Sequence, residues 1–284
     1  MNVLHAGGKK PILIRQGFAW SLPAWFVLLV GFVGPLFIVL FFSFLPPGTF
    51  GYEGDLTLAN YVDILRQGYV RTYVLSFLLA IITVVITLVL AYPVAYALIR
   101  IFSPRWALVI IALLTLPLFV SENIRLFGWS LILGKSGYLG GTIQMIFGIE
   151  VPGLLYNVPA IVLGLVYIYF PFMLFPLVLG LSMVPKDLVD ASRDLGASRV
   201  RAFWEVEVPL ARPGILIGVM LTFVLSLGAI AESVILGGKS IVMIATDIER
   251  AFSYQQNWPL GSALSVVLIV FAGVFVWLTL RHLD

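Results

Sequence analysis

Long apolar runs with almost no charge dominate this chain. Six of them contain about 20 residues or more, the length that an α-helix needs to cross about 30 Å of hydrocarbon. The chain is 61% hydrophobic and 11% charged, whereas soluble domains carry roughly 25% charged residues. We therefore predict an all-α membrane protein with six transmembrane helices, at about residues 18–45, 73–99, 106–133, 160–184, 214–236 and 260–280.

Basic residues are unevenly divided between the two sides that six spans define. Eleven of the seventeen Lys and Arg residues fall on the side of the termini and five on the other, with Arg125 inside the third span. Because Lys and Arg are enriched in cytoplasmic loops, we predict that both termini are cytoplasmic. Residues 1–17 then form a cytoplasmic N-terminal segment, and residues 18–284 form one transmembrane domain. The net charge of +3 includes no basic run, so it does not indicate nucleic-acid binding.

Residues 185–213, called the charged segment below, interrupt the apolar pattern. They hold five of the seventeen basic and five of the fourteen acidic residues. Pro185 can begin a helix, and Gly196 is the residue type favoured just beyond a helix C-terminus. Ser198 is a good N-cap for a second short helix. The segment therefore predicts two short helices joined at a glycine corner, on the cytoplasmic side.

The second short helix has an apolar face. Val200, Phe203 and Trp204 are spaced i, i+3, i+4, which places them together on a helix. Two interpretations remain open at this point. The face either lies on lipid headgroups or docks against another protein.

The spacing within the charged segment resembles a known motif. It is similar to E-A-A-x3-G-x9-I-x-L-P, found in the transmembrane subunits of binding-protein-dependent ABC importers. Asp190 replaces Glu, Ser192 replaces the second Ala, and two valines replace Ile and Leu, while the glycine and proline are in register. The matching residues are Asp190, Ala191, Ser192, Gly196, Val206, Val208 and Pro209.

Further stretches resemble the spermidine/putrescine permease branch of that family. They are Asn123–Gly128, Lys135–Leu139, Gly164–Tyr167, Pro171–Met173, Asp194–Ser198 and Trp258–Gly261. The resemblance implies a type I ABC importer permease fold in a bacterial inner membrane, with residues 18–284 as the permease domain. It also implies that the charged segment is the coupling loop, which docks in a groove of an ATPase subunit. The residues expected to act there are Asp190, Ala191, Ser192, Gly196, Ser198, Arg199, Val200, Arg201, Phe203, Trp204 and Pro209.

The resemblance also implies the partners. They are a second, homologous permease subunit, two ATPase subunits, an external substrate-binding protein and the lipid bilayer. We expect no cofactor on this chain, because ATP and Mg²⁺ would be bound by the ATPase. Two stretches end like a phosphate-binding loop, at Lys135-Ser136 and Lys239-Ser240, but each lacks the earlier glycine that the pattern requires. The chain is therefore predicted not to be an enzyme.

No metal site is expected either. The chain has no cysteine, and its two histidines, His5 and His282, lie at opposite ends.

Four polar residues fall at predicted membrane depth, where ionisable side chains are costly and often functional. In one interpretation Glu122 and Arg125 pair with each other or lie near the outer interface. In the other, Glu122 or Glu232 attracts a cationic substrate along a translocation path, with Asn123 adding hydrogen bonds. The predicted path residues are Glu122, Asn123, Arg125 and Glu232.

Within the spans, five prolines and one glycine pair bear on helix geometry. The prolines indicate either ordinary membrane-helix packing or helices broken around a path; they are Pro35, Pro93, Pro117, Pro171 and Pro176. Gly214 and Gly218 form a small-xxx-small pair, typical of close helix packing.

Two alternative functions remain beside the permease of a polyamine importer. One is an ion-coupled secondary transporter, although such folds often contain internal repeats that this sequence lacks. The other is the same ABC permease role for a substrate that is not a polyamine.

Overall fold

The computed structural model describes residues 21–48, 54–135, 137–149, 153–238 and 240–281, and it contains no strand within them. The predicted segment 1–17 and the first residues of the first span lie outside this part. Five helical stretches are long and apolar enough to cross a membrane, and a sixth crossing results if one bent pair of helices counts as one span. The five are Ser21–Phe42, Tyr69–Arg100 (α4), Val158–Ser182 (α8), Arg199–Leu227 and Trp258–Leu280 (α14).

The remaining elements include the parts of the Ser21–Phe42 and Arg199–Leu227 stretches. They are η1 (Leu29–Val33) and α2 (Gly34–Phe42) in the first span, then α3 (Ala59–Arg66), α5 (Pro104–Thr115), η2 (Leu116–Phe119), α6 (Glu122–Leu133), α7 (Tyr138–Phe147), α9 (Lys186–Asp194), α10 (Arg199–Ala202), η3 (Phe203–Glu207), α11 (Val208–Leu227), α12 (Ala231–Ile235) and α13 (Ile244–Ser253).

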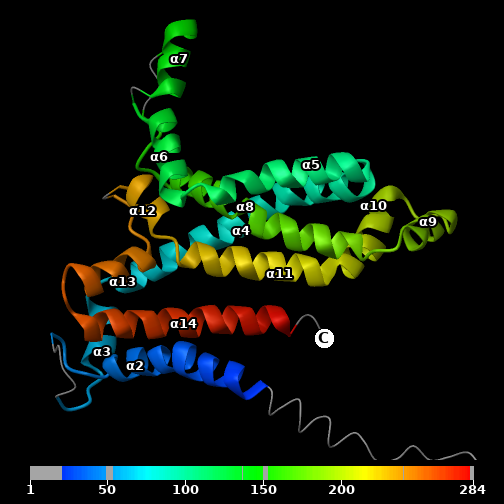
Figure 1. Ribbon diagram of the computed structural model, residues 1–284. Helices are drawn as coiled ribbons and strands as arrows, with labels where there is room; N and C mark the ends of the chain where they lie inside the picture. Colours follow the sequence, from blue (N-terminus) through cyan, green and yellow to red (C-terminus); the bar gives the residue numbers. More distant parts are fainter. Residues whose placement is uncertain (1–20, 49–53, 136, 150–152, 239, 282–284) are drawn as a thin grey trace, which may run out of the picture.

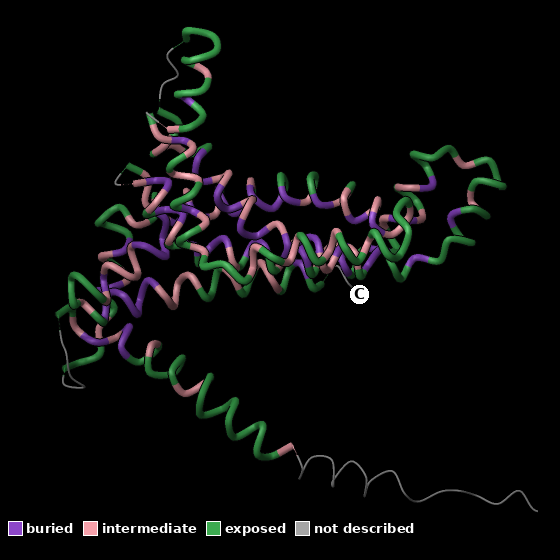
Figure 2. Tube along the Cα trace, turned by 45° about the horizontal axis from the view of Figure 1, so that its top comes forward, coloured by how far each residue is buried: buried purple, intermediate pink, exposed green. Residues whose placement is uncertain are grey.

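Helices α4, α8 and α11 run side by side and form the centre of the bundle (Figure 1). Most of their sequence is apolar on every side, which is typical of a helix that is buried all round. One core cluster contains residues from all three helices, including Leu98, Leu174 and Phe223. Phe223 stacks on Phe275 of α14 with ring centroids 3.6 Å apart. Burial concentrates along these central helices, while α2 is largely exposed (Figure 2).

Glycines allow α8 and α11 to approach closely. A Cβ atom added to Gly180 would lie 2.9 Å from the Cα atom of Gly214, and one added to Gly218 would lie 2.9 Å from the sulfur of Met173. Because neither position has room for a side chain, the two backbones come into direct contact. The close packing predicted from Gly214 and Gly218 is confirmed.

The prediction of one continuous third span at 106–133 is wrong. Helix α5 passes into the 3₁₀ segment η2, Val120 is extended, and α6 begins at Glu122. The two parts, Pro104–Phe119 and Glu122–Phe147, meet at 94°. Pro117, which lacks a backbone donor, lies in η2 next to this break. By contrast, α4 contains Pro93, and α8 contains Pro171 and Pro176, without interruption.

The predicted fifth span at 214–236 is displaced. Its helix is continuous from Arg199 to Leu227, through α10, η3 and α11, and ends at Gly228. Pro209, which lacks a backbone donor, lies within this continuous helix just after the π-helical segment η3. The charged segment therefore runs directly into the span, and residues 231–235 form the separate helix α12.

The bundle has two distinct ends in Figure 1. The turn between α4 and α5, helices α9 and α10, and the end of α14 lie at one end. Helices α3, α6, α12 and α13 lie at the other. Successive connections between the spans therefore lie at alternate ends of the bundle, which agrees with six crossings. The cytoplasmic side remains a prediction from the distribution of basic residues.

Candidate functional sites

The charged segment has the local structure that its sequence predicts. Helix α9 ends at Asp194, and Gly196 follows with φ +91°, in the left-handed region that favours glycine. Ser198 caps α10, because its Oγ accepts a hydrogen bond from the backbone N–H of Arg201 at 3.2 Å. The two short helices and the glycine corner are confirmed.

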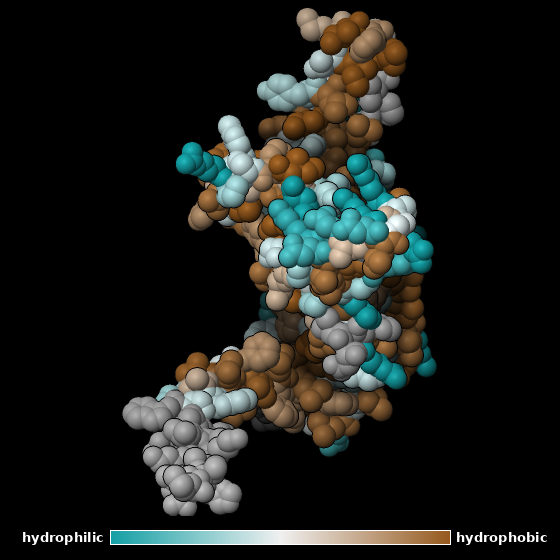
Figure 3. All heavy atoms as spheres, turned by 90° about the vertical axis from the view of Figure 1, so that its right-hand side faces the viewer, coloured by the Kyte–Doolittle hydropathy of each residue, from teal (hydrophilic) through white to brown (hydrophobic). Residues whose placement is uncertain are grey.

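Large apolar side chains are exposed on this segment. Leu195, Val200 and Trp204 have exposed fractions of 89%, 68% and 63%. Phe203 differs from them, because it is half-buried and its ring meets that of Tyr92 on α4, with centroids 5.2 Å apart. Figure 3 looks onto this end of the molecule and shows hydrophilic residues gathered on it, beside apolar surface. Exposed apolar groups among charges are typical of a protein-docking surface.

The other predicted residues of the segment are mostly exposed. Ser192 is the exception, half-buried with its hydroxyl donating to the Val189 carbonyl at 2.7 Å. Arg201 pairs with Glu205 at 2.9 Å on the surface, a kind of contact that adds little stability. The exposed residues are Asp190, Ala191, Gly196, Ser198, Arg199, Arg201 and Pro209.

A buried ion pair attaches the charged segment to the bundle, and the sequence analysis did not find it. The Arg100 guanidinium at the end of α4 lies 3.4 Å from the Glu207 carboxylate and donates to the Val184 carbonyl at 3.2 Å. The side chains of Arg100 and Glu207 are 11% and 5% exposed. No local pattern relates residues so far apart in sequence, so only the tertiary structure reveals the pair.

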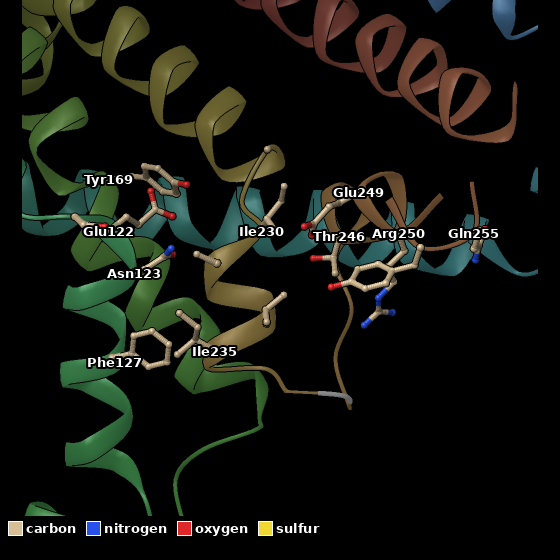
Figure 4. Close-up of a pocket in the computed structure, with 15 residues that line it drawn as sticks. Glu122, Asn123, Phe127, Tyr169, Ile230, Ile235, Thr246, Glu249, Arg250 and Gln255 are labelled. Carbon is tan, nitrogen blue, oxygen red and sulfur yellow. The ribbon is translucent and has the colours of Figure 1, made fainter. Parts of the chain in front are cut away.

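The second candidate site is a cleft at the opposite end of the bundle, with a volume of about 1040 Å³. The start of α6, the end of α11, and helices α12 and α13 form its walls. Figure 4 shows Glu122 and Asn123 on one side, and Thr246, Glu249, Arg250 and Gln255 on the other. Two of the four predicted path residues, Glu122 and Asn123, therefore line one cleft.

The cleft carries an excess of carboxylates. Glu122 and Glu249 line it, and no ion pair within the described residues engages either one. Arg250 also lines it but lies 3.7 Å from Asp247 on its own helix. Burial raises the pKa of Asp247, while a hydrogen bond from Thr72 and the Arg250 guanidinium act in the opposite direction. The surplus of negative charge favours a cationic ligand.

Glu232 lies buried beside this cleft rather than within a span. It belongs to α12, and its side chain packs over Gly164 of α8, where a Cβ atom would lie 3.4 Å from the Glu232 Cγ. The residue is 0% exposed, and neither carboxylate oxygen has a hydrogen bond of regular geometry within the described part of the chain. Glu122 and Tyr169 interact with it electrostatically. Burying a carboxylate that has no hydrogen bond of regular geometry is costly.

Arg125 faces away from the cleft. Its guanidinium lies over the Tyr167 ring, 5.7 Å from the centroid, in a separate apolar pocket that includes Pro117 and Phe170. No ion pair joins Arg125 to Glu122 within the residues that the structure describes. Pairing between these two residues therefore does not explain Glu122.

Helix α13 contributes cleft residues that are not among the predicted site residues. A detectable signal was present, because Ile244, Ile248 and Ala251 recur at helical spacing. The backbone N–H of Ile244 donates to the Ser76 hydroxyl at 2.8 Å, which fixes the start of α13 against α4. Thr246, Glu249, Arg250, Tyr254 and Gln255 thereby reach the cleft.

Comparison with known families identifies the chain. Residues 100–283 match the family described as the binding-protein-dependent transport system inner membrane component. The chain belongs to this family. It is thus a permease subunit of an ABC importer and a multi-pass protein of the bacterial inner membrane. The family match favours this assignment over an ion-coupled secondary transporter.

Named relatives agree with the family match. The spermidine/putrescine transport system permease protein PotB of Haemophilus influenzae is 30% identical over 283 residues, which cover 99% of this chain and 96% of that protein. PotB of Escherichia coli is 32% identical over 169 residues, covering 59% of this chain and 62% of that one. The inner membrane ABC transporter permease protein YdcU of Escherichia coli is 27% identical over 303 residues, covering 97% and 96%.

Solved structures share the fold. A bacterial ABC transporter involved in the import of the acidic polysaccharide alginate matches with a TM-score of 0.73 and 16% identity, covering 94% of each chain. A chain of an amino acid ABC transporter matches with a TM-score of 0.51 and 16% identity, covering 80% of this chain and 98% of that chain. These likenesses establish the ABC importer permease fold.

Proposed function

We propose that this permease subunit carries a small organic cation of the polyamine class, such as putrescine or spermidine, through the cleft between α6, α12 and α13. The observation that carries this proposal is the surplus of carboxylates there. Among the described residues, Glu122 and Glu249 line the cleft outside any ion pair, and Glu232 is buried beside it without a hydrogen bond of regular geometry. The two PotB relatives are named as permease proteins of spermidine/putrescine transport systems.

The charge arrangement suits transient binding of an amine. Ammonium groups form strong, charge-assisted hydrogen bonds with carboxylates. Glu122 also begins α6, where an acidic side chain interacts favourably with the positive end of the helix. That interaction weakens the pull of Glu122 on a cation and so favours release. Asn123 adds hydrogen-bonding groups at the same wall.

The charged segment would dock the ATPase. Leu195, Val200 and Trp204 present apolar surface to a partner, and the basic and acidic residues around them would fix its orientation. ATP and Mg²⁺ would be bound by that partner, with no cofactor on this chain. We further propose a complex of this chain with a second homologous permease, two ATPase subunits and an external substrate-binding protein. The charged segment then faces the cytoplasm, and the cleft opens toward the binding protein.

Uptake by the reconstituted complex tests the cargo. Proteoliposomes that contain both permeases, the ATPase and the binding protein are given radiolabelled putrescine, spermidine or a neutral sugar. We expect ATP-dependent uptake of the amines alone. Glu232→Gln removes a charge at nearly constant volume and should lower amine uptake by about tenfold, in the range of one lost charged interaction.

The exposed Asp55 provides the control, because it lies outside the cleft lining. Asp55→Asn should leave uptake unchanged. Equal amine uptake by the wild-type and Glu232→Gln complexes would contradict the proposed role of the Glu232 carboxylate. Uptake of the sugar in place of the amines would reject the substrate class.

A further inference from the structure

The link between the charged segment and the bundle concentrates on one guanidinium. Arg100 contacts the Val184 carbonyl, directly before the segment, and the Glu207 carboxylate, near the segment's end. Residues 184 and 207 enclose α9, the glycine corner and α10. One side chain of α4 therefore holds both ends of the part that projects from the bundle.

The surroundings of this link are packed against the bundle core on one side, and a polar pocket of about 130 Å³ lined by Lys186, Asp190 and Arg193 borders the pair on the other. Val189 on α9 and Ala202 on α10 are buried in the same core cluster as Leu98 of α4. Phe203 packs against Tyr92, about two helical turns from Arg100 along α4. Because the side chains of Arg100 and Glu207 are almost fully buried, breaking the pair leaves a charge that is largely removed from water without this partner. The pair thus resists separation of the segment from α4.

A rigid attachment has a mechanical consequence. Movement of α9 and α10 is transmitted to α4 only if these two helices do not slide along α4. Apolar contacts allow sliding, whereas a buried guanidinium that donates to the Val184 carbonyl and pairs with the Glu207 carboxylate restricts it. Helix α4 extends from this end of the bundle to the other, where Ser76 holds the start of α13 at the cleft.

We propose that Arg100 is a positioning residue that transmits movement of the charged segment to α4, and through Ser76 to the cleft. This inference rests on the proposed docking of the ATPase at the segment. The role is to couple ATP hydrolysis to opening of the cleft. It involves no contact with the cargo or with ATP.

Removing both charges together distinguishes a role of the Arg100–Glu207 pair in transmitting movement from a role in stabilising the fold. Arg100→Met alone leaves Glu207 buried without a partner, which destabilises the fold. The double variant Arg100→Met with Glu207→Met replaces the pair by apolar side chains, a change that proteins often tolerate. In the complete reconstituted complex, ATP hydrolysis and uptake of radiolabelled spermidine are measured together.

We expect the double variant to assemble and to hydrolyse ATP at the wild-type rate. Spermidine carried per ATP should fall by about tenfold, within the range usual for coupling between distant sites. Arg100→Lys keeps the charge and should recover part of the loss. Arg105→Met is the control, because Arg105 is an exposed basic residue at the same end of the bundle.

A second measurement does not depend on the cargo. The chain has no cysteine, so Ile101→Cys and Leu188→Cys place spin labels at the end of α4 and on α9. The distance between the labels should stay constant through the ATP cycle with Arg100 present, and change in the double variant. If the wild-type complex carries no amine but this result holds, only the proposed cargo fails.

Three outcomes would overturn the role of Arg100. These are an unchanged ratio of spermidine to ATP in the double variant, an unchanged label distance in it, and failure of the double variant to assemble. The last would show that the pair serves only to hold the fold together.

Discussion

Replacing Gly196 tests whether the glycine corner sets the orientation of the two short helices. Its φ of +91° is left-handed, and a Cβ atom added there would meet nothing within 4 Å. The penalty for Gly196→Ala is therefore conformational and free of steric clash. An L-residue in a left-handed conformation costs about 1–2 kcal/mol, which lowers the population of the native corner roughly 5- to 30-fold.

The loss should appear in ATPase binding. When a protein is only partly in its binding-competent state, the apparent affinity falls in proportion to that fraction. We therefore expect Gly196→Ala to weaken binding of the ATPase subunit by about tenfold. Gly196→Asn should weaken it less, because asparagine enters the left-handed region more readily. A titration of purified ATPase against the permease in nanodiscs, followed by fluorescence anisotropy, measures both.

Gly68 supplies a matched control for backbone strain. It has φ +84°, open space around its Cβ position, and a place at the opposite end of the bundle, before α4. Gly68→Ala should cost similar stability and leave ATPase affinity unchanged. Equal affinities for wild type and Gly196→Ala would show that the corner does not set the orientation of the two helices, as would equal losses of affinity for Gly196→Ala and Gly68→Ala.

Two further changes probe packing and docking. Gly214→Val should lower the Tm, because it forces α8 and α11 apart at a cost in stability of about 1–3 kcal/mol or more. Gly31→Val is the control and should leave the Tm unchanged, because nothing lies within 4 Å of its Cβ position. A normal Tm for Gly214→Val would contradict the close crossing. Trp204→Asp should weaken ATPase binding at constant Tm, because Trp204 is exposed, while Phe203→Asp should lower both, because Phe203 packs on Tyr92. Loss of Tm in Trp204→Asp would indicate that its ring is part of the core.

The sequence by itself determined the features that depend on nearest neighbours along the chain. The apolar runs predict helices that cross a membrane, because a bilayer core leaves an isolated segment no other way to pair its backbone. The corner at Gly196 and the cap at Ser198 follow from backbone freedom and a side-chain acceptor within a few residues. The structure confirms both.

The tertiary structure alone decided where helices break. Pro93, Pro117 and Pro171 have the same local chemistry, yet only the segment around Pro117 is interrupted among these three described positions. A proline removes one hydrogen bond and permits a kink, and neighbouring helices determine whether the helix continues. For the same reason, the sequence did not predict that the fifth span ends at Gly228 and that Glu232 lies on the separate helix α12.

The tertiary structure also decided which charges meet. Glu122 and Arg125 are one helical turn apart, yet one faces the cleft and the other the Tyr167 ring. Arg100 and Glu207 lie more than a hundred positions apart and form a buried pair. Side-chain pairing across a bundle depends on how the helices are packed and rotated. Sequence spacing within one helix does not contain that information.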